Sequence, residues 1–141
     1  MINLLHIDDD LEFLELIKIF AQKFYKSLKI SSICDPREIS SKFSIEELLA
    51  FDAIISDYKM PHLNGEEVLS YLRKNCIDTP FILCSSTCLE SLDIKNDIKY
   101  YLPKTKNINS LFSNLYDFLN NIIIEANNDS VHEPKKFPLL I

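Results

Sequence analysis

Short apolar runs alternate with amphipathic helical patterns along the chain, and this alternation constrains the fold more than any other feature of the sequence. The runs predict buried strands at residues 2–7, 28–34, 53–56, 81–84 and 99–102. Strands that alternate with helices favour a parallel sheet with right-handed crossovers and helices on both faces. We therefore predict an α/β fold, namely a flavodoxin-like doubly wound sheet of five parallel strands in the order 2-1-3-4-5.

The helices are predicted from apolar residues at helical spacing and from the capping residues that precede them. The first helix begins after Asp10, a suitable N-cap, and Phe13 widens its buried face. A second helical segment is expected to break at Ser44, which starts a capping-box pattern. Two further helices are predicted at residues 66–75 and 108–122.

The composition excludes several classes of function. With 141 residues, 47% of them hydrophobic, the chain has the make-up of one globular domain. Its net charge of −6 and the lack of a basic stripe argue against a nucleic-acid partner. Gly65 is the only glycine, which excludes glycine-rich phosphate loops. The four cysteines lack zinc-ligand spacing, and we expect them to be small buried side chains.

The two ends of the chain predict its location and its domain limits. The acids up to Asp10 exclude a signal peptide, and no apolar run has the length of a membrane span. We therefore expect a cytoplasmic protein without membrane contact. Residues 1–126 are predicted to form the domain, and residues 127–141 a flexible C-terminal tail. Residues 137–141 are apolar, and we expect them to dock on the protein itself or on a partner.

Polar side chains stand where four of the predicted strands end: Asp8 and Asp9, Asp57, Ser85, and Lys104. The carboxyl ends of parallel strands meet at one edge of the sheet, so these side chains should converge. Crowded carboxylates repel one another, and Mg2+ prefers carboxylate, water and phosphate oxygens, so the pattern predicts a magnesium site. A carboxylate can also accept a phosphoryl group, and a hydroxyl and an ammonium group can pair with its oxygens.

These motifs resemble the receiver domains of two-component response regulators. The resemblance covers residues 1–125 and rests on Asp8-Asp9, on Asp57 with Met60-Pro61 and Gly65, on Ser85 and on Lys104. It implies a phosphoryl-accepting switch of a two-component or phosphorelay system, whose Asp57 is phosphorylated by a histidine kinase or phosphotransfer protein. Too few residues follow the last helix for a DNA-binding module, so we expect a stand-alone protein with an unknown downstream partner, as a monomer or a homodimer.

The resemblance also assigns roles to individual residues. Mg2+ would be held by Asp8, Asp9, Asp57 and the backbone carbonyl of Lys59. Ser85 and Lys104 would assist phosphoryl transfer, and Ser85 and Tyr101 would change position on activation. A second interpretation of Tyr101, as a packed aromatic side chain without a switching role, stays open. The protein would not be an enzyme in the ordinary sense, although it would promote its own phosphorylation and dephosphorylation.

The sequence departs from the family pattern in two places. Thr105 replaces the proline that usually follows the lysine, so the peptide after Lys104 is expected to be trans and the lysine to be aimed differently. The interval between Ser85 and Lys104 is short and lacks the usual Gly-Ala pair. We expect the fourth helix, capped by Ser86 and Thr87, to be short or irregular and to alter the surface that usually meets partners.

Two other functions are compatible with parts of the pattern. A pseudo-receiver would bind proteins without being phosphorylated, but the intact Asp8, Asp9, Asp57 and Lys104 argue against it. A magnesium phosphohydrolase with an aspartyl nucleophile often places a second acid two residues later as the general acid. Lys59 occupies that position here, which argues against hydrolysis.

Overall fold

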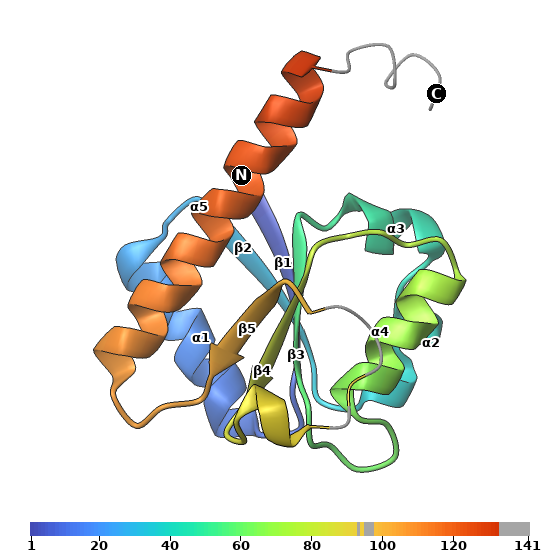
Figure 1. Ribbon diagram of the computed structural model, residues 1–141, viewed down its shortest axis with the longest axis vertical. Coiled ribbons are helices and arrows are strands. Elements are labelled where there is room, and N and C mark those ends of the chain that lie inside the picture. The colour runs from blue at the N-terminus through green and yellow to red at the C-terminus, as the bar shows by residue number, and fades with distance from the viewer. Residues whose placement is uncertain (93, 95–97, 133–141) are drawn as a thin grey trace.

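The computed structural model describes residues 1–92, 94 and 98–132, and its five strands form one parallel sheet (Figure 1). The strands are β1 (Ile2–Ile7), β2 (Leu28–Ile33), β3 (Ala53–Asp57), β4 (Phe81–Ser85) and β5 (Tyr100–Pro103). Their order in the sheet is β2-β1-β3-β4-β5, and every neighbouring pair is parallel. The predicted flavodoxin-like topology is therefore confirmed, with the more polar β2 at one edge.

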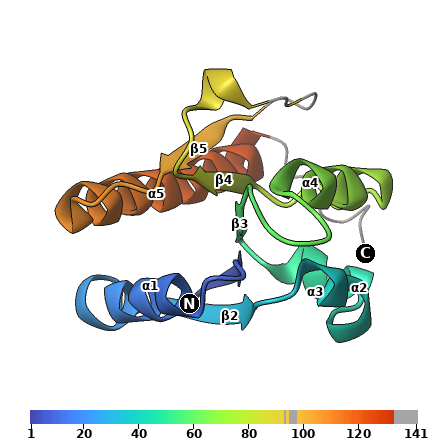
Figure 2. The same cartoon turned by 90° about the horizontal axis from the view of Figure 1, so that it is seen from below.

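Helices cover both faces of the sheet (Figures 1 and 2). One face carries α1 (Leu11–Phe24) and α5 (Ile108–His132), whereas the other carries the 3-10 turn η1 (Pro36–Glu38), α2 (Ile39–Lys42), α3 (Ile45–Ala50) and α4 (Gly65–Lys74). A second 3-10 turn, η2 (Leu89–Ser91), follows β4. None of the helices in the described part of the chain is both long and apolar enough to cross a membrane.

Two apolar cores lie on the two faces of the sheet, and adjacent strand residues point into different ones. Leu4 belongs to the core shared with α1 and α5, while Leu5 belongs to the core under α2, α3 and α4. This alternation follows from the two-residue period of a strand. Because both faces are buried, the strands need apolar residues at nearly every position, which is the pattern seen in the sequence.

Side-chain caps set the starts of the helices. Asp10 caps α1, and its side chain accepts hydrogen bonds from the backbone N–H groups of Glu12 and Phe13. The predicted capping box at Ser44 is present at the start of α3. Asn64 forms a second capping box and caps α4, so this helix begins at Gly65, one residue earlier than predicted. These caps place the first turns of α1 and α4 beside the strand ends that precede them.

Gly65 allows the chain after β3 to pack against the sheet. Its backbone N–H donates to the carbonyl oxygen of Tyr58 at 2.8 Å. A Cβ atom at this position would lie 2.6 Å from the carbonyl oxygen of Asp57 and 2.7 Å from the Cδ1 atom of Leu83. Only glycine fits this close approach without a shift of the backbone.

Three expectations from the sequence differ from the structure. The fourth helix is reduced to η2, and Cys88 rather than Ser86 or Thr87 precedes it, without a side-chain cap. Residues 93 and 95–97, where the predicted segment continues, lie outside the described residues. The shortness predicted for this segment is confirmed, but the predicted capping by Ser86 or Thr87 is wrong, because η2 begins after Cys88 and has no side-chain cap.

The other two differences concern the cysteines and the last helix. Only Cys84 is buried, whereas the other three cysteines are exposed because they lie in loops or turns. The last helix continues to His132, past its predicted end at residue 122. The flexibility of the tail and the docking of residues 137–141 stay predictions, since residues 133–141 lie outside the described part of the chain.

Candidate functional site

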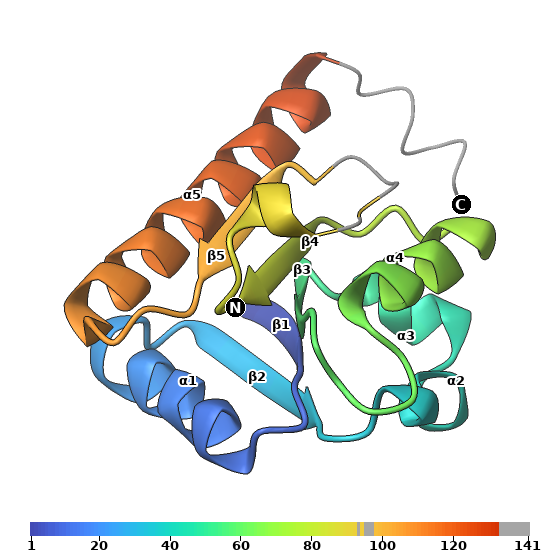
Figure 3. The ribbon, with the colours of Figure 1, turned by 60° about the horizontal axis from the view of Figure 1, so that its bottom comes forward.

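The strand ends that carry the polar residues singled out in the sequence lie at the carboxyl edge of one parallel sheet, whose strands are drawn in Figures 1 and 3. Asp8 follows β1, and Asp57 and Ser85 are the last residues of β3 and β4. Lys104 follows β5, and its backbone N–H donates to the carbonyl oxygen of Ser85 at 2.8 Å. Four neighbouring strands thus bring two acids, a hydroxyl and an ammonium group to one place.

The ammonium group of Lys104 lies between two carboxylates. Its Nζ atom is 2.8 Å from Oδ2 of Asp8 and 3.4 Å from Oδ1 of Asp57. The side chain of Lys104 is 19% exposed, and Asp8 is fully buried, so water screens this triad weakly. The peptide that follows Lys104 is trans, since the described residues contain no cis peptide bond. A trans link to Thr105 therefore still allows the lysine to reach both acids.

Burial perturbs the ionisation of this triad. Burial and the charge of Asp8 raise the pKa of Asp57 to about 6, although Lys104 opposes the effect. Burial also raises the pKa of Asp8. For Lys104, burial alone would lower the pKa, but the ion pairs with Asp8 and Asp57 hold it above its ordinary value. Two acids with raised pKa values beside a cation mark a site where a further positive charge would be favourable.

The acidic cluster fits a divalent cation. One carboxylate oxygen from each of Asp8, Asp9 and Asp57 lies within 4.8 Å of the other two. Octahedral Mg2+ holds its oxygens at about 2.1 Å, which small side-chain movements would allow here. Oδ1 of Asp8 accepts a hydrogen bond from the N–H of Asp10, whereas its buried Oδ2 atom is paired with the ammonium group of Lys104. This buried oxygen is suited to a metal ligand. Lys59 lies in the loop after β3 with an exposed side chain.

Ser85 and Tyr101 form a second group beside the acids. The Oγ atom of Ser85 is buried and accepts a hydrogen bond from the backbone N–H of Thr87 at 3.0 Å. The hydroxyl of Tyr101 donates to the carbonyl oxygen of Thr87 and lies 3.4 Å from that of Ser85. Tyr101 is half-buried and packs against the core under α4. The loop after β4 therefore connects Ser85 to Tyr101.

The ring of Phe13 also contacts the site, although the helical pattern predicted for this residue only a place on the buried face of α1. The Nζ atom of Lys104 lies 4.4 Å from the centre of this ring. The place of Phe13 in the first turn of the helix that follows Asp8 is the signal that could have revealed the contact, because that turn begins at the same edge of the sheet.

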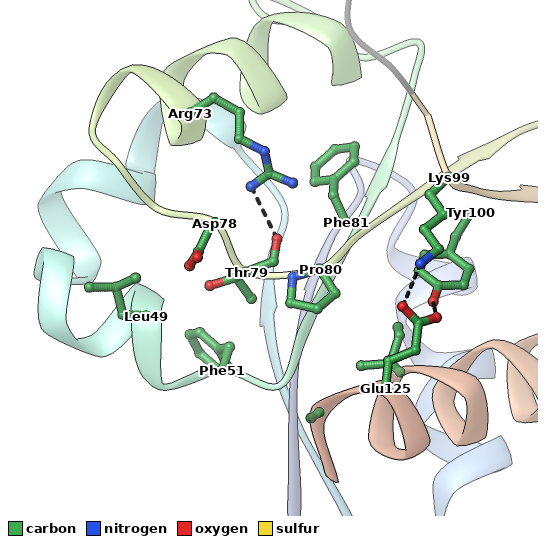
Figure 4. A pocket seen from close by; sticks show the side chains of 12 residues that line it. Leu49, Phe51, Arg73, Asp78, Thr79, Pro80, Phe81, Lys99, Tyr100 and Glu125 are labelled. Carbon is green, nitrogen blue, oxygen red and sulfur yellow. Dashed lines mark hydrogen bonds and ion pairs between the residues drawn. The ribbon is translucent and has the colours of Figure 1, made fainter. Parts of the chain in front are cut away.

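A pocket of about 400 Å3 lies at the opposite edge of the sheet (Figure 4). The guanidinium group of Arg73 donates there to the carbonyl oxygens of Ile77 and Thr79 at 2.7 Å and 3.1 Å. Lys99 pairs with Glu125, which also accepts a hydrogen bond from the hydroxyl of Tyr100. The two cations of this pocket thus have partners within the protein, and we place the chemistry at the acidic edge instead.

Solved structures with the same architecture are receiver domains. A response regulator receiver domain protein from Clostridium thermocellum is 24% identical with a TM-score of 0.71, and the alignment covers 90% of this chain and 98% of that one. The response regulator TrrA from Thermotoga maritima, solved in complex with Mg2+-BeF, is 25% identical with a TM-score of 0.71, over 86% of this chain and 99% of that one. The chemotaxis response regulator CheY4 of Vibrio cholerae is 22% identical with a TM-score of 0.67, and the alignment covers 83% of this chain and 98% of that one.

Sequence comparison leads to the same family. Residues 4–116 match the family model of the response regulator receiver domain. The comparison with curated protein sequences gives no match. The matched range contains β2 to β5, all of β1 except its first two residues, and the four strand ends that form the acidic edge. From this match and from the fold, the chain belongs to the response regulator receiver domain family.

Proposed function

We propose that the protein is a phosphoryl-accepting signalling switch whose acceptor is Asp57. The observation that carries the proposal is the triad at the carboxyl edge, where the ammonium group of Lys104 lies 2.8 Å from Asp8 and 3.4 Å from Asp57. Asp57 is 7% exposed at the end of β3, so its carboxylate is largely enclosed at the edge of the sheet.

The proposed reaction is a phosphoryl transfer onto a carboxylate. An oxygen of Asp57 attacks the phosphorus atom of a phosphohistidine on a histidine kinase or phosphotransfer protein. The P–O bond to Asp57 forms as the P–N bond breaks, and the imidazole leaves with the bonding electron pair. Lys104 shifts its ion pair from Asp57 to a phosphoryl oxygen, and Ser85 donates its hydroxyl to another.

A magnesium ion would be held by Asp8, Asp9, Asp57 and the backbone carbonyl of Lys59. The three carboxylates meet the geometric requirement, and the Thermotoga TrrA structure supports the assignment because it contains Mg2+-BeF. The ion would supply charge neutralisation between the carboxylates and the incoming phosphoryl oxygens. Asp8 would keep one oxygen fixed by the N–H of Asp10 and offer the other to the ion.

The switch would run through the loop after β4. If Ser85 turns its hydroxyl toward a phosphoryl oxygen, its Oγ atom releases the N–H of Thr87. The carbonyl of Thr87 holds the hydroxyl of Tyr101, so a movement of Thr87 also shifts Tyr101. A change of charge at Asp57 would thus alter the surface near η2, which a downstream protein could recognise.

Intact-mass measurement tests the proposal. Phosphoramidate, whose P–N bond resembles that of phosphohistidine, is added with Mg2+, and the wild-type protein should gain the mass of one phosphoryl group. Asp57→Asn and chelation of the metal should each abolish the gain. Asp117→Asn, which changes an exposed acid on α5, is the matched control and should behave as the wild type does. Equal labelling of the Asp57→Asn variant would disprove the assignment.

The same experiment decides between the switch and a protein-binding scaffold. A wild-type protein that gains no mass from phosphoramidate or from acetyl phosphate would favour the scaffold. The raised pKa of Asp57 and the ion pair of Lys104 are the observations that favour the switch, because a scaffold has no need for buried charges at this edge.

A further inference from the structure

We propose that the ring of Phe13 positions Lys104 for phosphoryl transfer by a cation–π contact with its ammonium group. The inference deepens the proposed function and rests on it. Phe13 would be a positioning residue rather than a catalytic one, since it acts through Lys104.

The geometry places the ammonium group among three partners. The Nζ atom lies 2.8 Å from Asp8, 3.4 Å from Asp57 and 4.4 Å from the centre of the Phe13 ring. A lysine ammonium has three N–H groups, and each partner can attract a different one. The ring distance is well within the range of cation–π contacts, which strengthen when the cation is partly removed from water.

The ring itself is held in place on two sides. Phe13 is 9% exposed, and its backbone N–H donates to the carboxylate of Asp10 at 3.3 Å. The N–H of Asp10 donates in turn to Oδ1 of Asp8 at 2.9 Å. On the other side, the ring of His6 packs against Phe13 with centroids 5.6 Å apart and an angle of 73°. The first turn of α1 is thereby fixed relative to the acid that pairs with Lys104.

A ring is suited to this task because it attracts a cation without offering a lone pair. During phosphoryl transfer, Lys104 has to exchange Asp57 for a phosphoryl oxygen. A carboxylate in place of the ring would retain the ammonium group, whereas an aliphatic side chain would leave that side without electrostatic attraction. The face of Phe13 can hold the ammonium group near the reacting oxygens and still allow it to turn toward them.

The test is a series of fluorinated phenylalanines placed at position 13 alone. Fluorine atoms weaken the negative face of the ring in steps but change its shape little, so the fold is retained. The rate of phosphorylation by phosphoramidate with Mg2+ should fall with each fluorine, by about ten-fold for the trifluorinated ring, or about 1.4 kcal/mol. The same series at Phe112, which packs between α1 and α5 away from the site, is the control and should leave the rate unchanged.

A second readout does not depend on phosphorylation. In the unphosphorylated protein, the ring current of Phe13 should shift the Cε proton signals of Lys104 in NMR spectra, and Phe13→Leu should remove the shift. Phe13→Tyr keeps the ring and should keep the shift. The absence of a shift in the wild type would overturn the proposal.

The two readouts separate this inference from the proposed function. A rate that stays constant along the fluorinated series, with the shift present, would show that the ring contacts Lys104 without positioning it, which also overturns the inference. If the wild type accepts no phosphoryl group, the proposed function fails and so does positioning for that reaction. If the NMR shift is nevertheless present in that case, Phe13 contacts Lys104 but does not position it for phosphoryl transfer.

Discussion

Replacement of Asp57 by asparagine is expected to stabilise the metal-free protein, although it removes the proposed phosphoryl acceptor. Burial and the charge of Asp8 raise the pKa of Asp57 from 3.8 to about 6. The ionised carboxylate is therefore less favourable in the folded protein than in the unfolded chain. Asparagine has nearly the same shape as aspartate, so the substitution removes the charge and leaves the packing in place.

The magnitude follows from the pKa difference. One pKa unit corresponds to about 1.36 kcal/mol, so a pKa raised by about 2 amounts to about 3 kcal/mol. The pKa of Asp57 is higher in the folded protein than in the unfolded chain, so the folded protein binds the proton more tightly. Proton binding therefore stabilises the folded protein at low pH, and this stabilisation is lost as the pH rises through the folded-state pKa. The advantage of Asp57→Asn in the free energy of unfolding should be about 3 kcal/mol at pH 8 and about 1 kcal/mol at pH 4.5.

Urea unfolding in the presence of a chelator measures this difference. The chain contains no tryptophan, so circular dichroism is the suitable signal. Asp117→Asn serves as the control, because this exposed acid on α5 lies away from the site and its loss should give no such gain. Addition of Mg2+ should stabilise the wild type more than Asp57→Asn and so narrow the difference. The reasoning is refuted if Asp57→Asn is no more stable than the wild type at pH 8, or if its advantage is the same at pH 4.5.

Three further predictions concern the loops and caps. Gly65→Ala should lower the free energy of unfolding by about 1–3 kcal/mol, because its Cβ would lie 2.6 Å from the carbonyl oxygen of Asp57; an unchanged urea midpoint would contradict the close approach. Ser44→Ala should lower the free energy of unfolding by about 1 kcal/mol, because α3 loses its capping box; thermal unfolding with no change in midpoint would argue against this. Self-dephosphorylation should be slow, and Lys59→Asn with Thr87→Glu should accelerate phosphate release in Mg2+, because these side chains can orient the attacking water; a double variant no faster than the wild type would show that neither position limits the reaction.

The fold and the positions of the main site residues could be predicted from the sequence. Strands buried on both faces need apolar residues at nearly every position, and such runs are visible without any structure. The carboxyl ends of parallel strands lie at one edge, so Asp8, Asp57, Ser85 and Lys104 had to come together once the strand order was known. The caps at Asp10 and Ser44 are local, because each involves residues within three positions in the chain.

The remaining features depend on contacts between segments that are distant in the sequence. The raised pKa of Asp57 arises from burial and from Asp8, which reaches it only through the pairing of β1 with β3. The contact between Phe13 and Lys104 joins the first turn of α1 to the end of β5, two segments that only the fold brings together. The hydrogen bond between Tyr101 and Thr87 likewise depends on how β4 and β5 lie together in the sheet. The sequence by itself determined which groups stand at the strand ends, whereas only the tertiary structure decided where they point and how they ionise, since burial and charge act through space.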